Sequence, residues 1–350
     1  MHLRKRSIQE ILIETKYFWD VEETPIEVRR EFHKVIKCRT GELGYSWRRL
    51  PSGRFVLRAN SCKSRVCPSC GWKATLDWVN GIKALLPDCQ YVGIGFSMPN
   101  VLWDVFWHNR NLLKDLSAIG AQVISAWAHK RFHCELPILV VRHTFGAHLN
   151  FNCHLHILVP KAGLDEIEFT LTRGVFFPKS ILVPAWRDAV LDYLKAAVRG
   201  GIKLQSAHVF DLPHYLETQT NAYWNGKVEH LSKKTLFAKY ISRYLRRLPI
   251  SERRILPSDD THVKFLVRDK KLKETVPDCL LKEDFVNLLI QQVLSPWEHG
   301  VRYFGLLAPR RTREFALYWK LLGQVQPPRP ARLTYADCLS MIDEKHRRVR

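Results

Sequence analysis

The spacing of apolar residues along the chain predicts a mixture of helices and strands. Ile8, Ile11 and Leu12 stand at helical intervals, which predicts one or two helices over residues 7–37, interrupted near Pro25. The same period of 3.6 residues marks three later segments, which are expected to be helical as well. These segments are residues 101–133, 184–199 and 233–248.

Runs of β-branched and apolar residues predict the strands. The two clearest runs are 137–145 (PILVVRHTF) and 152–159 (NCHLHILV). The short polar link between them predicts an antiparallel hairpin. Shorter runs predict strands at 90–97 and 263–267, whereas 224–227 (WNGK) is typical of a turn. Residues 38–72 are rich in glycine and cysteine.

Length and charge narrow the class of protein. The chain has 350 residues, of which 46% are hydrophobic, so it is long enough for about two folded domains. Lysine and arginine number 55 against 34 acidic residues, a net charge of +21. A folded protein this basic is expected to bind a polyanion such as nucleic acid, and an anionic membrane surface is the competing partner.

The sequence does not favour a membrane protein. No run of about 18 apolar residues is present, and the stretch Met1 to Arg6 lacks the apolar region of a signal peptide. We therefore expect a soluble, intracellular protein, and the family resemblance described below implies a cytoplasmic, nucleoid-associated one of bacterial type. In that compartment the nine cysteines are expected to remain reduced.

Four cysteines lie close together in the glycine-rich segment. Cys67 and Cys70 form a C-x2-C pair with Pro68 between them, which lets two thiolates converge on one tetrahedral zinc ion, and Cys62 and Cys38 complete four sulfur ligands. The alternative is four small, buried, reduced cysteines. Four thiolates leave no position for a substrate, so the zinc is expected to be structural. Surrounding cations favour a DNA-docking module or form a solvated face: Arg48, Arg49, Arg54, Arg58, Lys63 and Arg65.

Two histidines lie on the strand at 152–159. His154 and His156 are two residues apart, so both side chains leave the same face, while Leu155 and Ile157 enter the opposite one. Two imidazoles on one pleated face can ligate a divalent cation. The alternative is a pair of histidines that only form hydrogen bonds on a half-polar face.

Two tyrosines lie on the helix expected at 236–248. Tyr240 and Tyr244 are four residues apart and therefore share one side of that helix. They either belong to its apolar stripe or lie beside phosphate held by cations of the same helix, which are Lys239, Arg243, Arg246 and Arg247.

Together the two elements indicate a reaction. A cation on His154 and His156 would polarise a non-bridging oxygen of a phosphodiester, while a tyrosine phenolate attacks phosphorus in line. The products would be a 5′-phosphotyrosyl adduct and a 3′-hydroxyl. A second tyrosine in register would allow a second cleavage or strand transfer before the first end is released.

Five motifs in this order resemble a known family. They are C-x4-C-P-x-C at 62–70, HTFG at 143–146, NCHLHILV at 152–159, YISRYLRR at 240–247 and HGVRYFGLLA at 299–308. The chain resembles, from about residue 30 to 310, the two-tyrosine HUH transposases of the insertion-sequence ninety-one group. The resemblance implies rolling-circle-type transposition of single-stranded DNA, with His154 and His156 as metal ligands and Tyr240 and Tyr244 as nucleophiles.

The resemblance also implies a fold and cofactors. The expected fold is α+β: an HUH endonuclease core, with the histidine strand central in an antiparallel sheet and the tyrosine helix packed across it, preceded by a helical, zinc-binding N-terminal module. Zn²⁺ would be structural and Mg²⁺ or Mn²⁺ catalytic. Relatives often carry histidine at the position of Asn152. His143 is therefore the first candidate for a third metal ligand, with Asn152 or a residue of the tyrosine helix as the alternative.

The expected domains are 1–85 for zinc and DNA docking, 86–322 for catalysis and 323–350 for a basic tail. The residues 1–70 and 301–350 hold two thirds of the excess positive charge, as expected if these regions hold DNA while the centre cuts it. Near Tyr303 and Phe304, three arginines are expected to contact DNA or to form a solvated face: Arg302, Arg310 and Arg311.

The expected partners are single-stranded transposon ends and target DNA, with no membrane. Two other functions stay open from the sequence. One is a plasmid replication initiator or relaxase that uses the same histidine and tyrosine chemistry. The other is a zinc-stapled DNA-binding protein without catalysis.

Overall fold

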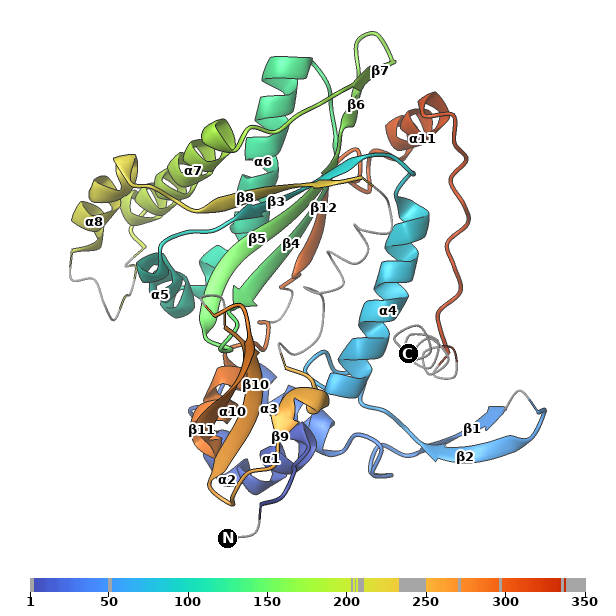
Figure 1. The fold of residues 1–350 in the computed structure, drawn as a ribbon, viewed down its shortest axis with the longest axis vertical. Coiled ribbons are helices and arrows are strands. Elements are labelled where there is room, and N and C mark those ends of the chain that lie inside the picture. The colour runs from blue at the N-terminus through green and yellow to red at the C-terminus, as the bar shows by residue number, and fades with distance from the viewer. Residues whose placement is uncertain are drawn as a thin grey trace.

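The computed structural model describes residues 3–49, 52–202, 204, 206, 211–232, 250–269, 272–295, 298–334 and 337. At its centre lies a five-stranded, fully antiparallel sheet with the strand order β12-β4-β5-β3-β8 (Figure 1). The strand that carries the two histidines, β5, is the middle one. The strands are β3 (Tyr91–Phe96), β4 (Pro137–Phe145), β5 (Phe151–Pro160), β8 (Gly226–Leu231) and β12 (Val301–Gly305).

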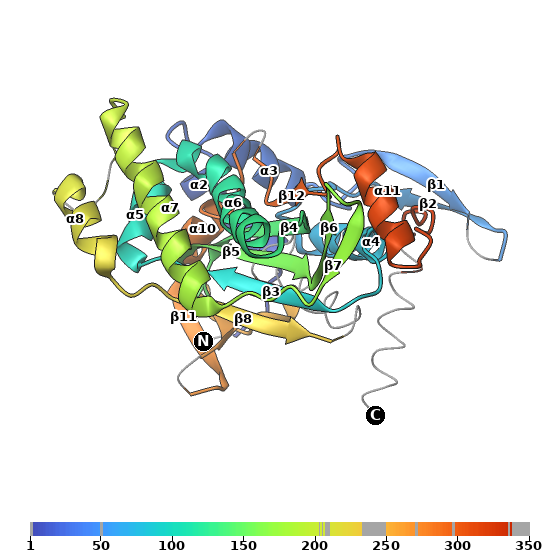
Figure 2. The same cartoon turned by 90° about the horizontal axis from the view of Figure 1, so that it is seen from above.

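One face of this sheet is covered by helices α6 and α7 (Figure 2). Alternation along β5 sends Leu155 and Ile157 into that face, where both are fully buried. Gly120 of α6 lies directly over them, and a side chain there would overlap Leu155. The helices on this side are α5 (Asn100–His108), α6 (Leu113–Phe132), α7 (Lys179–Arg199) and α8 (Leu212–Thr218).

The opposite face is partly covered by helix α4 (Pro68–Leu85). Ile82 near its end packs against Leu139 and Leu158 of the sheet. Its first turn contains Cys70. An α-helix of this length spans about 27 Å, so α4 connects the cysteine cluster to the face of the sheet that carries the histidines (Figure 1). Helix α11 (Thr312–Leu321) joins the same apolar cluster through Phe315 and Trp319.

A second core lies below the sheet (Figure 1). Its N-terminal helices begin with a capping box, in which Ser7 and Glu10 exchange hydrogen bonds. They pack against a segment some 250 residues later, and the ion pair between Lys282 and Glu14 joins the two parts. The elements are α1 (Ile8–Glu14), α2 (Lys16–Trp19), α3 (Ile26–Ile36), β9 (Ile255–Leu256), β10 (His262–Arg268), β11 (Thr275–Leu281) and α10 (Lys282–Ile290).

Two hairpins extend from these layers. The first, β1 (Tyr45–Arg49) with β2 (Phe55–Ala59), projects from the part of the chain that contains the cysteines (Figure 1). The second, β6 (Ala162–Asp165) with β7 (Thr170–Arg173), lies beside α11. None of the described helices combines the length and the apolar character that crossing a bilayer requires.

The expected α+β fold is confirmed, as are the hairpin of β4 and β5 and the central position of the histidine strand. The helix expected at 101–133 is in fact two helices, because Asn109 leaves helical geometry and its side chain caps the end of α5. The turn expected at 224–227 is wrong, since Gly226 and Lys227 begin β8 and pair with β3. The helix expected at 233–248 lies outside the described residues.

Packing contacts cross the domain boundary that the sequence analysis expects at residue 85. Residues 250–293, assigned by the sequence to the catalytic domain, share the lower core with the N-terminal helices. Buried Arg6 donates to the backbone oxygens of Ser258 and Asp259, which adds polar contacts to the apolar ones. The zinc-binding part of the chain is therefore built from two distant stretches of sequence.

Candidate active site and metal centres

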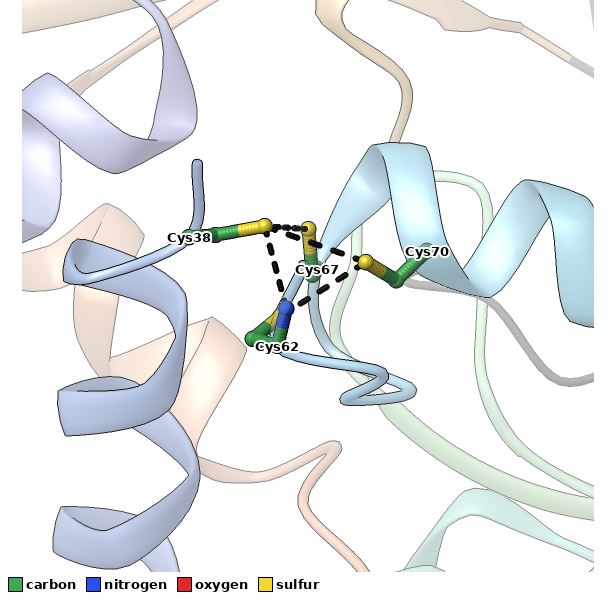
Figure 3. Close-up of side chains that lie close together, drawn as sticks. All are labelled: Cys38, Cys62, Cys67 and Cys70. Atoms are coloured by element: carbon green, nitrogen blue, oxygen red, sulfur yellow. Dashed lines mark hydrogen bonds between the residues drawn. The ribbon is translucent and has the colours of Figure 1, made fainter. Parts of the chain in front are cut away.

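Four cysteines from three parts of the chain meet at the base of α4 (Figure 3). Cys38 follows α3, Cys62 follows β2, Cys67 caps α4 and Cys70 lies in its first turn. Neighbouring Sγ atoms are 3.7 Å apart for Cys62 and Cys70, and 3.8 Å apart for Cys38 with Cys67 and with Cys70. A tetrahedron with Zn–S bonds of about 2.3 Å has S···S edges of about 3.8 Å. Three of the six edges therefore match a tetrahedral zinc site, and all four sulfurs lie within 4.8 Å of one another.

The sulfurs of this cluster share protons unequally. The backbone N–H of Cys62 donates to Cys38 Sγ, and the backbone N–H of Ser64 donates to Cys62 Sγ, both at 3.4 Å. Hydrogen bonds from the thiols of Cys62 and then Cys67 lower the pKa of Cys70 to about 2, whereas the hydrogen bonds to Cys67 and Cys70, with burial, raise the pKa of Cys62 well above its ordinary value. Zinc takes cysteine only as thiolate, so binding of the ion would release the protons that the cluster holds.

Three histidines meet on the face of the sheet opposite α6 and α7. His143 of β4 is the direct cross-strand partner of His154 on β5, and His156 lies two residues further along. The ring centroids are 5.1 Å apart for His143 and His154, 4.8 Å for His143 and His156, and 5.0 Å for His154 and His156. One ligand nitrogen from each ring lies within 4.8 Å of the others. The register of two strands thus brings His143 to the pair that the sequence identified.

The rings of this histidine cluster are held in place. The Nδ1 of His154 lies 2.9 Å from the backbone oxygen of Asn152, which can only accept, so Nδ1 carries the proton and Nε2 presents a lone pair. Phe145 stacks on His143 at 5.0 Å between centroids. Burial, with His154 and Lys227 nearby, lowers the pKa of His156 to about 3. A neutral imidazole is the form that binds a metal ion.

Asn152 gives an independent indication of a ligand at this place. Its position on β5 puts it on the same face as His154 and His156. Its side-chain Oδ1 is buried and accepts no hydrogen bond from the described residues. A buried carbonyl oxygen without a partner is costly, and a cation held by the histidines would supply one. The donor set of three imidazoles and one amide oxygen fits a divalent transition metal.

A buried ion pair behind the histidines escaped the sequence interpretation. Arg142, adjacent to His143, pairs with Glu298, and both side chains are at most 6% exposed. Arg142 also donates to the backbone oxygen of Leu113. Arg110 donates to the backbone oxygens of Gln291 and Val293 at 3.1 Å. The only sequence signs were an arginine inside an apolar strand and the glutamate just before the HGVRYFGLLA motif.

These contacts fix β12 against β4. The motif at 299–308, which the sequence analysis read as a stretch that contacts DNA, therefore also holds the sheet together. Tyr303 accepts a hydrogen bond from Trp78 at 3.0 Å, and Phe304 packs against the core under α6. Both rings are half-buried in these contacts, and their stacking on unpaired bases stays a prediction. Arg302 is exposed and lies over Phe304, Arg310 is exposed, and Arg311 is ion-paired with Glu166 and Glu314.

The expected nucleophiles and their cations lie outside the described residues. This holds for Tyr240 and Tyr244 and for the four neighbouring cations, which are Lys239, Arg243, Arg246 and Arg247. Their roles, and those of Arg302, Arg310 and Arg311 in DNA binding, stay predictions. Of the sequence-derived site, the structure brings together the four cysteines and the three histidines.

Comparison with known proteins gives a consistent result. A family model described as "Putative transposase" matches residues 138–314, and one described as "Transposase zinc-binding domain" matches residues 11–98. A protein named "Transposase for insertion sequence element IS801", from Pseudomonas savastanoi pv. phaseolicola, is 30% identical over 290 residues, covering 79% of this chain and 69% of the relative. "Putative transposase y4qJ" from Sinorhizobium fredii (strain NBRC 101917 / NGR234) is 27% identical over 329 residues, covering 85% and 79%. No solved structure matches the chain.

Proposed function

The chain belongs to the two-tyrosine transposases of the insertion-sequence ninety-one group, and on this premise we propose that it nicks and rejoins single-stranded DNA at transposon ends through a 5′-phosphotyrosine intermediate. The observation that carries the proposal is the cluster of His143, His154 and His156 on the middle of the sheet. Rigid strands hold these ligands, and a histidine cluster of this kind suits a reacting phosphate better than a folding role.

In this proposal the histidines and Asn152 hold a divalent cation. When bound, the cation withdraws charge from a non-bridging oxygen of the scissile phosphate. Imidazole is a softer ligand than the oxygens that Mg²⁺ prefers, so three histidines favour Mn²⁺ over Mg²⁺. The Nδ1–H of His154 donates to the backbone oxygen of Asn152, which leaves the Nε2 of His154 free of a proton and able to bind the cation. His143 is the third ligand in preference to a residue of the tyrosine helix, since its ring already lies beside the other two.

The bond changes balance without another reagent. The phenol oxygen of Tyr240 or Tyr244 loses its proton and forms a bond to phosphorus, while the bond from phosphorus to the 3′ oxygen breaks and that oxygen takes up a proton. The 5′ end stays on the tyrosine as a phosphodiester. A later 3′-hydroxyl can attack the same phosphorus and release the tyrosine, which rejoins the DNA. Two tyrosines allow two such exchanges to proceed in turn.

The proposal is tested by trapping the adduct. The full-length protein is incubated with end-labelled, single-stranded DNA from the termini of its own element and with Mn²⁺ or Mg²⁺. The labelled DNA is expected to migrate with the protein on a denaturing gel, with more adduct in Mn²⁺. Absence of an adduct with either metal would overturn the nuclease proposal and leave a DNA-binding protein without catalysis.

Variants of the two tyrosines assign the nucleophile. Tyr240→Phe and Tyr244→Phe singly are expected to reduce the adduct or to block one of two steps, and the double variant is expected to form none. Tyr223→Phe, which alters an exposed tyrosine on another segment, serves as the matched control. An adduct that persists in the double variant contradicts the assignment. Equal cleavage of transposon ends and unrelated plasmid origins would instead favour a replication initiator or relaxase.

A further inference from the structure

The β1–β2 hairpin has two chemically different faces. The register pairs Tyr45 with Ala59, Trp47 with Leu57 and Arg49 with Phe55, so these six side chains share one face. Arg48 and Arg58 lie on the other, opposite Val56 and Ser46. The ribbon therefore gathers its three rings on one side, together with Arg49, and carries Arg48 and Arg58 on the other.

The aromatic face of this hairpin is exposed. Tyr45, Trp47 and Phe55 are 60%, 67% and 60% exposed, and Leu57 is 53% exposed. Figure 1 shows the hairpin extending away from both cores. An isolated two-stranded hairpin is marginally stable in water, and three exposed rings in one patch mark an interaction site more often than a packing feature. The patch is thus built for a partner.

The cysteine cluster holds the base of the hairpin. Cys38 precedes β1 and Cys62 follows β2, so the whole ribbon is inserted between the first and second sulfur ligands. Asn60 joins the two ends: its backbone N–H donates to Gly44 O at 2.9 Å, and its backbone oxygen accepts from the N–H of Arg39 at 3.0 Å. A zinc ion on the four sulfurs would fix the direction of the ribbon relative to α4.

The charge of the hairpin identifies the partner as a polyanion. Between Tyr45 and Ala59 the chain has four arginines and no acidic residue, and all four arginines are exposed: Arg48, Arg49, Arg54 and Arg58. A second copy of the same ribbon would bring eight arginines together, which Coulomb repulsion opposes. In double-stranded DNA the faces of the bases are stacked on each other, so rings can stack only on unpaired bases.

We infer that the β1–β2 hairpin binds unpaired DNA bases, which stack on Tyr45, Trp47 and Phe55, while Arg49 on the same face and Arg54 in the turn contact phosphates along the same strand. This rests on the proposed function only in that DNA is the substrate. It adds the element that reads the single-stranded state and the chemistry by which it does so. The phosphate contacts supply the affinity that depends on salt, and the rings supply the preference for single strands.

Binding is measured where cleavage cannot occur. The full-length Tyr240→Phe, Tyr244→Phe protein is titrated into a fluorescent single-stranded DNA of about 20 nucleotides and into its duplex, over a range of salt concentrations. The change Trp47→Ala with Phe55→Ala is expected to weaken single-strand binding about tenfold for each ring and duplex binding less than about twofold. The change Arg49→Gln with Arg54→Gln is expected to lower the salt slope for single strands by about 1.4.

The β6–β7 hairpin provides a matched control. Its exposed Ile167 and Phe169 resemble the patch in exposure, but Glu166 and Glu168 flank them. Ile167→Ser with Phe169→Ser is expected to leave DNA binding unchanged. Two further variants separate stacking from folding: Trp47→Tyr keeps a ring and should keep affinity, whereas Trp47→Leu keeps apolar volume and should lose it. Zinc content verifies that each variant is folded.

Three results would overturn the inference. The first is an affinity for single strands that stays unchanged when the rings are removed. The second is an equal loss of affinity for single strands and for duplex. The third is a wild-type dimer that dissociates in the ring variant while DNA binding persists, which would show that a second copy covers the patch. The covalent adduct is measured separately in the unmodified chain with saturating DNA. If the hairpin does not bind unpaired bases, the adduct should still form. If the protein is not a nuclease, the binding result for the hairpin should still hold.

Discussion

The cysteine cluster and the histidine cluster both gather metal ligands, but they are built in opposite ways. The four cysteines come from three parts of the chain, of which only the start of α4 supplies two, and their sulfurs lie close enough together to be the corners of a tetrahedron. The three histidines come from two adjacent strands in the middle of a sheet whose other face is fully packed. A metal ion on the cysteines would join separate parts of the chain, whereas a metal ion on the histidines would lie on a sheet that is already formed.

The comparison teaches how the ligand set and its support indicate function. Four thiolates fill the coordination of zinc, so that ion can only stabilise. A cation held by three imidazoles would keep coordination positions open for phosphate, and we expect the sheet to fold without metal. Loss of ligands should therefore unfold one region and silence the other.

The largest expected effect is on the cysteine cluster. Cys70→Ser should release the zinc and unfold the module that contains residues 250–293, because zinc contributes about 10–16 kcal/mol to the folding of small zinc domains. Elemental analysis and limited proteolysis measure this. Cys279→Ser, at an exposed cysteine outside the cluster, is the control. Full zinc content in Cys70→Ser would show that the four sulfurs do not form the site.

Removing the histidines should have the second largest effect, on activity and not on stability. His154→Ala with His156→Ala should abolish adduct formation, and His143→Ala should reduce it by more than about 100-fold, while zinc content stays unchanged. His148→Ala, an exposed histidine in the loop between β4 and β5, should retain activity. Wild-type activity in His143→Ala would exclude it as the third ligand.

The apolar neighbour of the histidines tests the claim that the sheet folds without metal. Leu155→Ala should lower the free energy of unfolding by about 2–5 kcal/mol, since the side chain is fully buried under Gly120. Urea unfolding with and without Mn²⁺ measures it. Leu57→Ala, an exposed leucine in the β1–β2 hairpin, should change stability by less than about 0.5 kcal/mol. A sheet that unfolds when Mn²⁺ is removed would break the comparison.

The smallest effect concerns the cap of α1, which belongs to the core beside the cysteines. The N–H and hydroxyl of Ser7 donate to the Glu10 carboxylate, which lowers its pKa. This stabilisation is complete above the ordinary glutamate pKa of about 4.3 and is lost as the pH falls through the lowered value. Ser7→Ala should cost about 1 kcal/mol at neutral pH.

The pH dependence supplies the measurement. Glu10→Gln should remove part of the decline in stability between neutral and acidic pH, and Glu22→Gln, at an exposed position outside the cap, should not. Differences from the unmodified protein are compared at each pH, so that zinc release common to both cancels. An identical acid profile for Glu10→Gln would exclude a contribution from the cap.

The sequence determined what lies within single elements. The alternation along 152–159 fixed the common face of His154 and His156, and the spacing of Cys67 and Cys70 around the start of a helix fixed half of the zinc site. Both follow from local geometry. Side chains two positions apart on a strand, or three positions apart on a helix, point to the same side of their element. The sequence analysis did not predict the strands β1 and β2, although aromatic or apolar residues alternate with polar ones within YSWRR and FVLRA.

Only the tertiary structure decided which elements meet. His143 became the third member of the histidine cluster through the register of β4 against β5, and a shift of one residue would have sent it to the other face. The packing of 250–293 on the N-terminal helices, and the partial burial of Tyr303 and Phe304, depend likewise on contacts between distant segments. The sequence thus gives the chemical groups, and long-range packing decides which of them share a site. The hydrophobic effect favours burial of every apolar face but has no direction, so it does not by itself determine which two faces meet.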